Sequence, residues 1–177
     1  MICNPCLDFN VVTNSIDVNC NLNVTGSITG NGEPVGSAVY LSSYGSTSQS
    51  IPTATLTAVT YGTNTLVNWG TQSSTSVFTP PVPGTYLVNV NAYWTSVPAS
   101  GTTKLLIQKN STTVSEQIWL GALDSETMHV ATVVPMNGTT DTITTYLYQS
   151  TSTSQTSGGV ADGTYYGNNI QIDRLHA

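Results

Sequence analysis

One stretch of the chain, residues 84–94 (GTYLVNVNAYW), alternates its side chains with a period of two. Successive side chains of a β-strand point to opposite faces, whereas a helix would need a period of 3.6. The stretch therefore predicts a strand with two distinct faces. The first face holds Tyr86, Val88, Val90, Ala92 and Trp94, and the second holds Leu87, Asn89, Asn91 and Tyr93.

Composition extends this prediction to the whole chain. Only 7% of the 177 residues are charged, against about 25% in an average globular domain. Helices carry Glu, Lys and Arg on their solvent face, and here Thr, Ser and Asn take their place. Thr suits the exposed face of a strand, and Ser and Asn suit turns. We therefore expect an all-β protein.

Further strand patterns follow at a spacing of about 8–12 residues, which is typical of a β-sandwich or jelly roll. The segments between them, such as PASG, GALD and NGTTD, have the residues of turns. No window has a helical period. The expected strands cover residues 53–61, 84–94, 103–110, 114–120, 126–136, 141–149 and 164–175.

The N-terminal part has a different pattern. Residues 1–34 carry short apolar groups about six residues apart between Asn, Asp and Gly, and residues 35–50 are rich in Ser and Gly. Short strands of this kind close a core when several chains wrap together. We therefore divide the chain into residues 1–50, a β-type stalk or attachment segment with a neck, and residues 51–177, a head domain. A floppy N-terminal tail is the alternative for the first part.

The segment VFTPPVPGTYLVNVNAYW resembles the central signature of the C1q/TNF-like jelly-roll superfamily, in which an aromatic residue, Pro, Gly and Tyr lead into a long strand. The turn predicted at Pro83-Gly84 fits this pattern. Residues 133–149 and 164–177 are similar to the family's later strands, with Gly138 and Asp141 near its Gly-Asp turn. The residues that carry the resemblance are Phe78, Pro80, Pro83, Gly84, Tyr86 and Gly167.

The resemblance implies a two-sheet antiparallel jelly roll that assembles as a homotrimer and binds a ligand or receptor without catalysis. The chain lacks the collagen-like repeat of C1q relatives. The segment NLNVTGSITGNGEPV looks like the repeated stalk sequences of virus and phage fibres. These features favour a virion fibre or spike whose N-terminal segment attaches to a capsid or other virion protein. Its head would bind a host receptor or glycan.

The chain has three cysteines, Cys3, Cys6 and Cys20, all in the N-terminal part. A redox C-x-x-C motif needs a βαβ context, and zinc needs four ligands, so neither chemistry is expected. Two interpretations stay open: thiols that lock chains together or anchor the stalk, and free thiols in a reducing compartment.

No catalytic constellation is recognisable, and we expect no enzyme. His129 and His176 have no G-x-S-x-G elbow beside them, which favours structural roles. Asp124 and Glu126 would share one face of a strand, so a carbohydrate-active enzyme is a distant third reading. We expect no cofactor; calcium is a weak alternative because no D-x-D-x-D loop exists. The three N-x-S/T matches, at Asn23, Asn110 and Asn137, fit chance in so Asn- and Thr-rich a chain.

Charge and hydropathy exclude other classes of partner. The net charge is −6 with three basic residues, which disfavours nucleic acid and anionic membranes. No apolar run is long enough to span a bilayer, and residues 1–10 lack the basic and apolar regions of a secretory signal. We therefore expect the virion surface as the location. The alternative is a cell-derived adhesion or spore-coat module outside the cell or on its surface.

Overall fold

The computed structural model describes residues 7–10, 15–18, 29–30, 33–34, 40–45, 48–61, 63–67, 76–95, 100–121, 127–158, 160–161, 164–165 and 167–176. The chain divides into two compact units, Met1–Gly36 and Ser37–Ala177. Every regular element among the described residues is a β-strand, as the composition predicts. None of the described segments is a helix that could cross a membrane.

The first unit contains two short antiparallel hairpins. One pairs β1 (Leu7–Asn10) with β2 (Ser15–Val18), and the other pairs β3 (Thr29–Gly30) with β4 (Glu33–Pro34). Short strands separated by Asn and Gly were expected here. Strands of two to four residues bury little apolar surface and are marginal in isolation.

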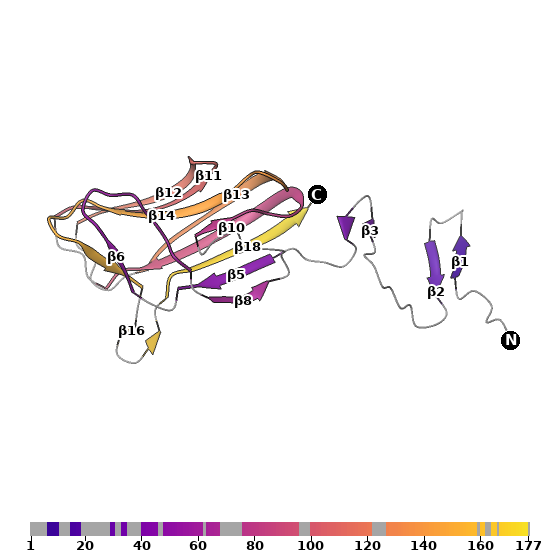
Figure 1. Cartoon of the computed structure of the whole chain (residues 1–177), viewed down its shortest axis with the longest axis horizontal. Coiled ribbons are helices and arrows are strands. Elements are labelled where there is room, and N and C mark those ends of the chain that lie inside the picture. Colours follow the sequence, from indigo (N-terminus) through magenta and orange to yellow (C-terminus); the bar gives the residue numbers. More distant parts are fainter. Residues whose placement is uncertain are drawn as a thin grey trace. The chain divides into compact units, whose positions relative to one another are not determined.

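The second unit is a sandwich of two antiparallel sheets (Figure 1). We call the first the inner sheet; its strand order is β13-β10-β18-β5-β8. Its strands are β5 (Tyr40–Tyr44), β8 (Thr63–Val67), β10 (Pro83–Tyr93), β13 (Thr127–Asn137) and β18 (Asn169–His176).

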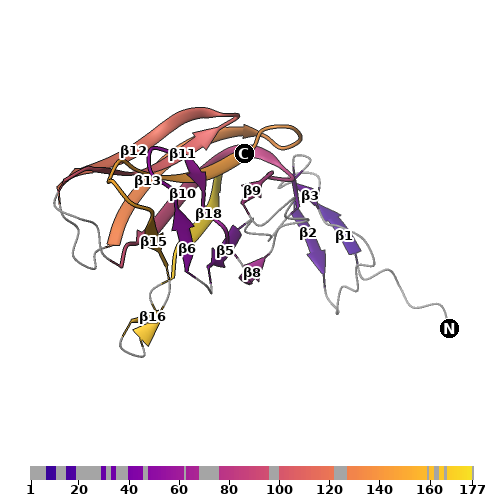
Figure 2. The ribbon, with the colours of Figure 1, turned by 60° about the vertical axis from the view of Figure 1, so that its left-hand side comes forward.

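The second sheet, which we call the outer sheet, has the order β12-β11-β14-β7, and β9 also pairs with β14. The short pair β6 (Gln49–Ile51) and β15 (Gln155–Ser157) and the hairpin β16 (Val160–Ala161)–β17 (Thr164–Tyr165) complete the unit. The β16 strand lies away from the two sheets in both views (Figure 2). The outer strands are β7 (Thr57–Ala58), β9 (Val77–Phe78), β11 (Thr102–Lys109), β12 (Thr112–Leu120) and β14 (Ile143–Gln149).

The core lies between the sheets and confirms the predicted alternation. Tyr86, Val88, Val90, Ala92 and Trp94 are all fully buried. The inner sheet adds apolar side chains from β13 and β18, and the outer sheet adds them from β11 and β14. These further core residues include Met128, Val130, Val134, Ile170, Ile172, Leu105, Ile107, Ile143 and Leu147.

The structure differs from the expected boundaries at two places. The sandwich unit begins at Ser37 instead of residue 51, because β5 of the expected neck pairs with both β18 and β8. The strand expected over residues 53–61 is reduced to β7. Ala54 has a φ of +52° and its N–H donates to Gln149 O at 2.7 Å, so the chain turns there before it joins the sheet.

Candidate functional site

Strand registers define two ends of the sandwich. Tyr40, at the start of β5, lies opposite Asp173 near the end of β18, and Pro83 lies opposite Asn137. We call this the proximal end, because the chain enters the sandwich here. The distal end is at the other end of the sandwich, where Tyr93 pairs with Thr127 in the inner sheet and Thr102 pairs with Leu120 in the outer sheet.

The family-signature residues gather at the proximal end and in the adjoining core. Tyr86 is fully buried, and its hydroxyl donates to Val82 O at 2.7 Å. Phe78 is buried in β9 and pairs with Ile143. Pro83 and Gly84 are the first residues of β10, so the turn expected at this pair was wrong: the bend precedes it, at residues 81–82. These residues fix how the strand starts, which is a structural role.

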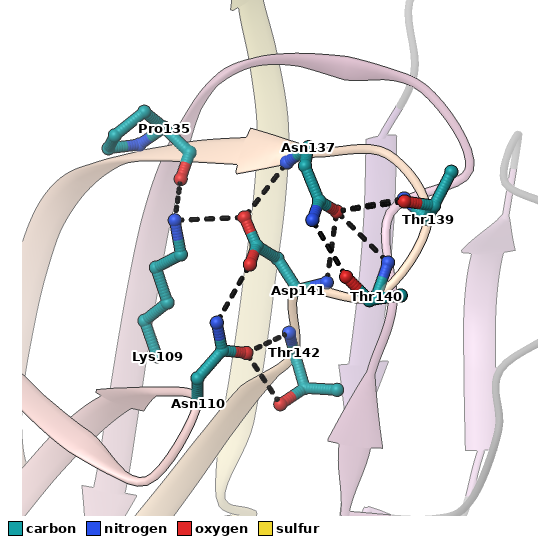
Figure 3. A network of polar contacts seen from close by, with 8 residues as sticks. All are labelled: Lys109, Asn110, Pro135, Asn137, Thr139, Thr140, Asp141 and Thr142. Carbon is teal, nitrogen blue, oxygen red and sulfur yellow. Dashed lines mark hydrogen bonds and ion pairs between the residues drawn. The ribbon is translucent and has the colours of Figure 1, made fainter.

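A polar network closes the turn after β13 (Figure 3). Asn137 Oδ1 accepts hydrogen bonds from the backbone N–H groups of Thr139, Thr140 and Asp141 at 2.9–3.0 Å. In return, Asp141 Oδ2 accepts the N–H of Asn137 at 2.9 Å. The short polar side chains thus satisfy the turn's backbone donors.

The same carboxylate ties this turn to the β11–β12 turn. Asp141 Oδ2 lies 2.9 Å from Lys109 Nζ, and Oδ1 accepts from Asn110 Nδ2 at 2.7 Å. The hydrogen bond from Lys109, followed by that from Asn110, holds the pKa of Asp141 below its ordinary value. Asp141, singled out in the sequence, therefore links the two turns, and Gly138 lies in the turn after β13.

A groove of about 270 Å³ lies on the exposed face of the outer sheet, in its distal half. Strand β11 places Thr102, Lys104 and Leu106 on this face, since Leu105 and Ile107 point into the core. Register brings Tyr148 of β14 opposite Lys104. The complete lining is Leu56, Thr102, Lys104, Leu106, Tyr148 and Ser150.

Polar groups surround the aromatic ring of this groove. Lys104 Nζ lies over the Tyr148 ring, 5.9 Å from its centroid, and 3.8 Å from Glu116 Oε2. The side chains of Lys104 and Glu116 are 32% and 41% exposed, so solvent screens this pair and both groups can bind other partners. At the rim, Ser150 Oγ accepts the N–H of Thr102 at 2.9 Å.

Buried Gln149 holds the loops that border the groove. Its Nε2 donates to Ile51 O at 3.0 Å and to Thr153 O at 3.1 Å. Its Oε1 accepts from Thr151 N at 2.7 Å and from Thr151 Oγ1 at 2.6 Å. One side chain thereby fixes the segment leading to Leu56 and the segment after Ser150.

The exposed face of the inner sheet carries amides in its middle. Asn91 Nδ2 donates to Asn169 Oδ1 at 2.9 Å, and His129 Nε2 donates to Asn89 Oδ1 at 2.6 Å. Nearer the proximal end, Leu87 and Val133 are direct neighbours on this face. His129 therefore belongs to a surface ladder of side chains.

Several residues proposed from the sequence lie outside the described residues. They are Cys3, Cys6, Cys20, Asp124 and Glu126. Gly167 is described; it is half-buried and lies just before β18. Within the described part of the chain, no three His, Cys, Asp or Glu residues gather as a metal site would require.

Sequence reasoning missed the groove and its support. Alternation in residues 103–110 and 141–149 does place Lys104 and Tyr148 on solvent-facing positions. What it does not give is their pairing, which depends on the β11–β14 register. The sequence indicates the role of Gln149 less clearly. Gln149 follows Ile143, Thr145 and Leu147 on the buried face of β14, and a polar side chain on that face needs buried hydrogen-bond partners.

The sequence matches no protein-family model and no curated protein. Solved structures do match the fold. The Eiger TNF of S. frugiperda aligns at a TM-score of 0.58 and 11% identity, covering 78% of this chain and 92% of that chain. Murine APRIL, at pH 8.0, aligns at a TM-score of 0.58 and 14% identity, covering 78% and 100%.

A third structure, PRD1 vertex protein P5, aligns at a TM-score of 0.52 and 16% identity, covering 80% of this chain and all of that chain. At sequence identities this low, the matches show that the chains share a fold and nothing more. The two antiparallel sheets and these neighbours confirm the architecture expected from the signature segment: this chain has the C1q/TNF-like jelly-roll fold.

Proposed function

We propose that the chain is a homotrimeric virion surface fibre or spike. Its N-terminal part attaches to the particle, and its jelly roll is displayed for attachment to a host receptor or glycan. The likeness to a vertex protein, PRD1 P5, supports the virion setting. The likeness to Eiger TNF and to APRIL, which are TNF-like, supports a binding role over a catalytic one.

The observation that carries the proposal is the placement of exposed apolar side chains. Leu120 is 79% exposed and Val133 is 53% exposed. Others are on the same strands, β12, β13 and β18: Val114, Ile118, Trp119 and Leu175. Exposed apolar side chains on neighbouring strands favour a protein interface, and a homotrimer would bury those on the inner sheet.

The two edge strands that carry most of these residues are neighbours. Gln117 Oε1 of β12 accepts the N–H of His129 of β13 at 2.8 Å, although the strands belong to different sheets. Val133 lies beside Leu87 on the exposed face of the inner sheet, whereas Ile118 and Leu120 lie opposite Lys104 and Thr102 on the exposed face of the outer sheet. A second copy packed against β13 would cover the apolar side chains on the exposed face of the inner sheet and leave the exposed face of the outer sheet open.

The native mass of the full chain tests the trimer. We expect about 56 kDa, three times the 18.6 kDa of one chain. Val133→Asp places a charge in the proposed interface and should yield monomers at the same concentration. Ser152→Asp adds the same charge on an exposed loop and should leave the trimer intact. A wild-type monomer would overturn the trimer.

Immunogold labelling tests the location. An antibody against the chain should label the surface of intact virus particles. Labelling of cell surfaces in cultures free of particles would contradict the virion setting and favour a cell-derived adhesion module.

A further inference from the structure

We propose that the groove on the outer sheet is a saccharide site that takes one uncharged pyranose ring. This inference rests on the proposed attachment function and deepens it, since it names the ligand class and the residues. The groove lies in the distal half of the outer sheet, away from the proximal end at which the chain enters the sandwich.

The chemistry of the lining fits a sugar. A pyranose has C–H groups on its faces and hydroxyls around its edge, so its site needs an aromatic or aliphatic floor with polar groups at the rim. Tyr148, Leu106 and Leu56 supply the floor. Lys104 supplies donors, and Glu116 supplies acceptors.

The ring of Tyr148 can stack on a ligand. Lys104 Nζ is 5.9 Å from its centroid, whereas carbon atoms in contact lie about 3.5–4.0 Å apart. A sugar stacked on this face needs about twice that contact distance between the ring and the ammonium, so it would displace the ammonium; the Lys104 side chain is 32% exposed and can move aside. A sugar stacked there would place its hydroxyls within reach of the Lys104–Glu116 pair.

The charge of the site selects an uncharged sugar. Lys104 and Glu116 cancel each other, and the chain as a whole carries −6. A carboxylated sugar would gain the ammonium but meet the Glu116 carboxylate at the same place. Repulsion between the sugar carboxylate and the Glu116 carboxylate would disfavour binding.

The size of the groove limits the ligand to a single ring. Its volume of about 270 Å³ is just below the range of about 300–1,000 Å³ for pockets of drug-sized ligands. For so shallow a site we expect weak binding, with a dissociation constant on the order of 1 mM. Three copies in a trimer would raise the apparent affinity on a surface that presents many glycans.

Saturation-transfer NMR with the full chain tests the site. The probes are the methyl glycosides of glucose, galactose, mannose and N-acetylglucosamine, with those of glucuronic acid and sialic acid as charged competitors. We expect transfer to at least one uncharged glycoside and none to the charged pair. Binding of the charged glycosides alone, or of none of the six, would overturn the proposal.

Variants separate stacking from general effects. Tyr148→Ala should weaken binding at least about tenfold, and Tyr148→Phe should retain it, since stacking needs only the ring. Tyr146→Ala is the matched control, because Tyr146 is on the same face of β14 but does not line the groove. Equal losses in Tyr148→Ala and Tyr146→Ala, at unchanged melting temperature, would contradict the site.

The charge argument has its own test. Glu116→Gln leaves Lys104 uncompensated, so this variant should gain binding of the glucuronic acid glycoside that the wild type lacks. If it does not, the carboxylate is not what excludes charged sugars.

Failure of this inference can be told from failure of the attachment function. If the wild-type chain blocks adsorption of particles to host cells and Tyr148→Ala blocks it equally well, the groove is wrong and attachment stands. If the wild-type chain does not compete at all, attachment itself fails.

Discussion

Gly138 lies directly against Pro83: a Cβ atom added to Gly138 would overlap the backbone nitrogen of Pro83 and the carbonyl carbon of Val82. The φ of Gly138 is also +74°, a backbone conformation that residues other than glycine rarely adopt. The turn after β13 and the start of β10 are therefore packed backbone to backbone, and only glycine fits between them.

Gly138→Ala should lower the free energy of unfolding by at least about 3 kcal/mol, from the left-handed backbone and the overlap together. Urea denaturation measures it. Asn tolerates a positive φ but also carries a Cβ. Gly138→Asn should therefore be as damaging as Gly138→Ala; recovery in the Asn variant would mean that φ alone, without the overlap, requires glycine.

Asp141→Asn should make stability less dependent on pH in the acid range. The folded pKa of Asp141 is below its ordinary value, so its contribution is complete above about pH 4 and is lost as the pH falls through the folded pKa. The melting temperature of the variant should be lower than wild type at pH 7, and the difference should close as the pH falls below the folded pKa of Asp141. Glu116→Gln, which removes a looser pair, is the control. A gap that persists at low pH would contradict the assignment.

The buried pair Tyr61–Thr145 should behave as a coupled unit. Their hydroxyls are 2.7 Å apart, Tyr61 is fully buried, and burial raises its pKa despite the hydrogen bond with Thr145. Tyr61→Phe and Thr145→Val should each cost about 1–2 kcal/mol, because each leaves the other hydroxyl unsatisfied. The double variant should cost about 1 kcal/mol less than the sum, measured in a double-mutant cycle. Strict additivity would mean that the two hydroxyls do not interact.

Gln149→Leu should destabilise the fold by about 2–4 kcal/mol, since leucine is apolar and leaves the polar groups around it unpaired. Hydrogen exchange should also rise in the segments from residue 51 to 56 and from 150 to 155. Ser152→Ala, at an exposed position in the second segment, should change neither quantity. Unchanged exchange in Gln149→Leu would show that other contacts hold these loops.

The proximal end illustrates how far sequence reasoning carries. The segment that leads into β10 identified the fold, and Phe78 and Tyr86 are buried as core residues should be. The turn expected at Pro83-Gly84 was wrong because both residues pair with β13. A Pro-Gly pair is compatible with a turn or with the start of a strand, and the partner strand decides between them.

The sequence by itself determined the fold class and which side chains of residues 84–94 and 103–110 share a face, because alternation with a period of two is a local property of the backbone. Only the tertiary structure decided which strands are neighbours. It recruited β5 from the expected neck into the inner sheet, and it brought Lys104 to Tyr148 across the β11–β14 register. Pairing depends on hydrogen bonds between segments far apart in the chain, so no local pattern specifies it. The groove proposed to bind a sugar depends on this strand pairing.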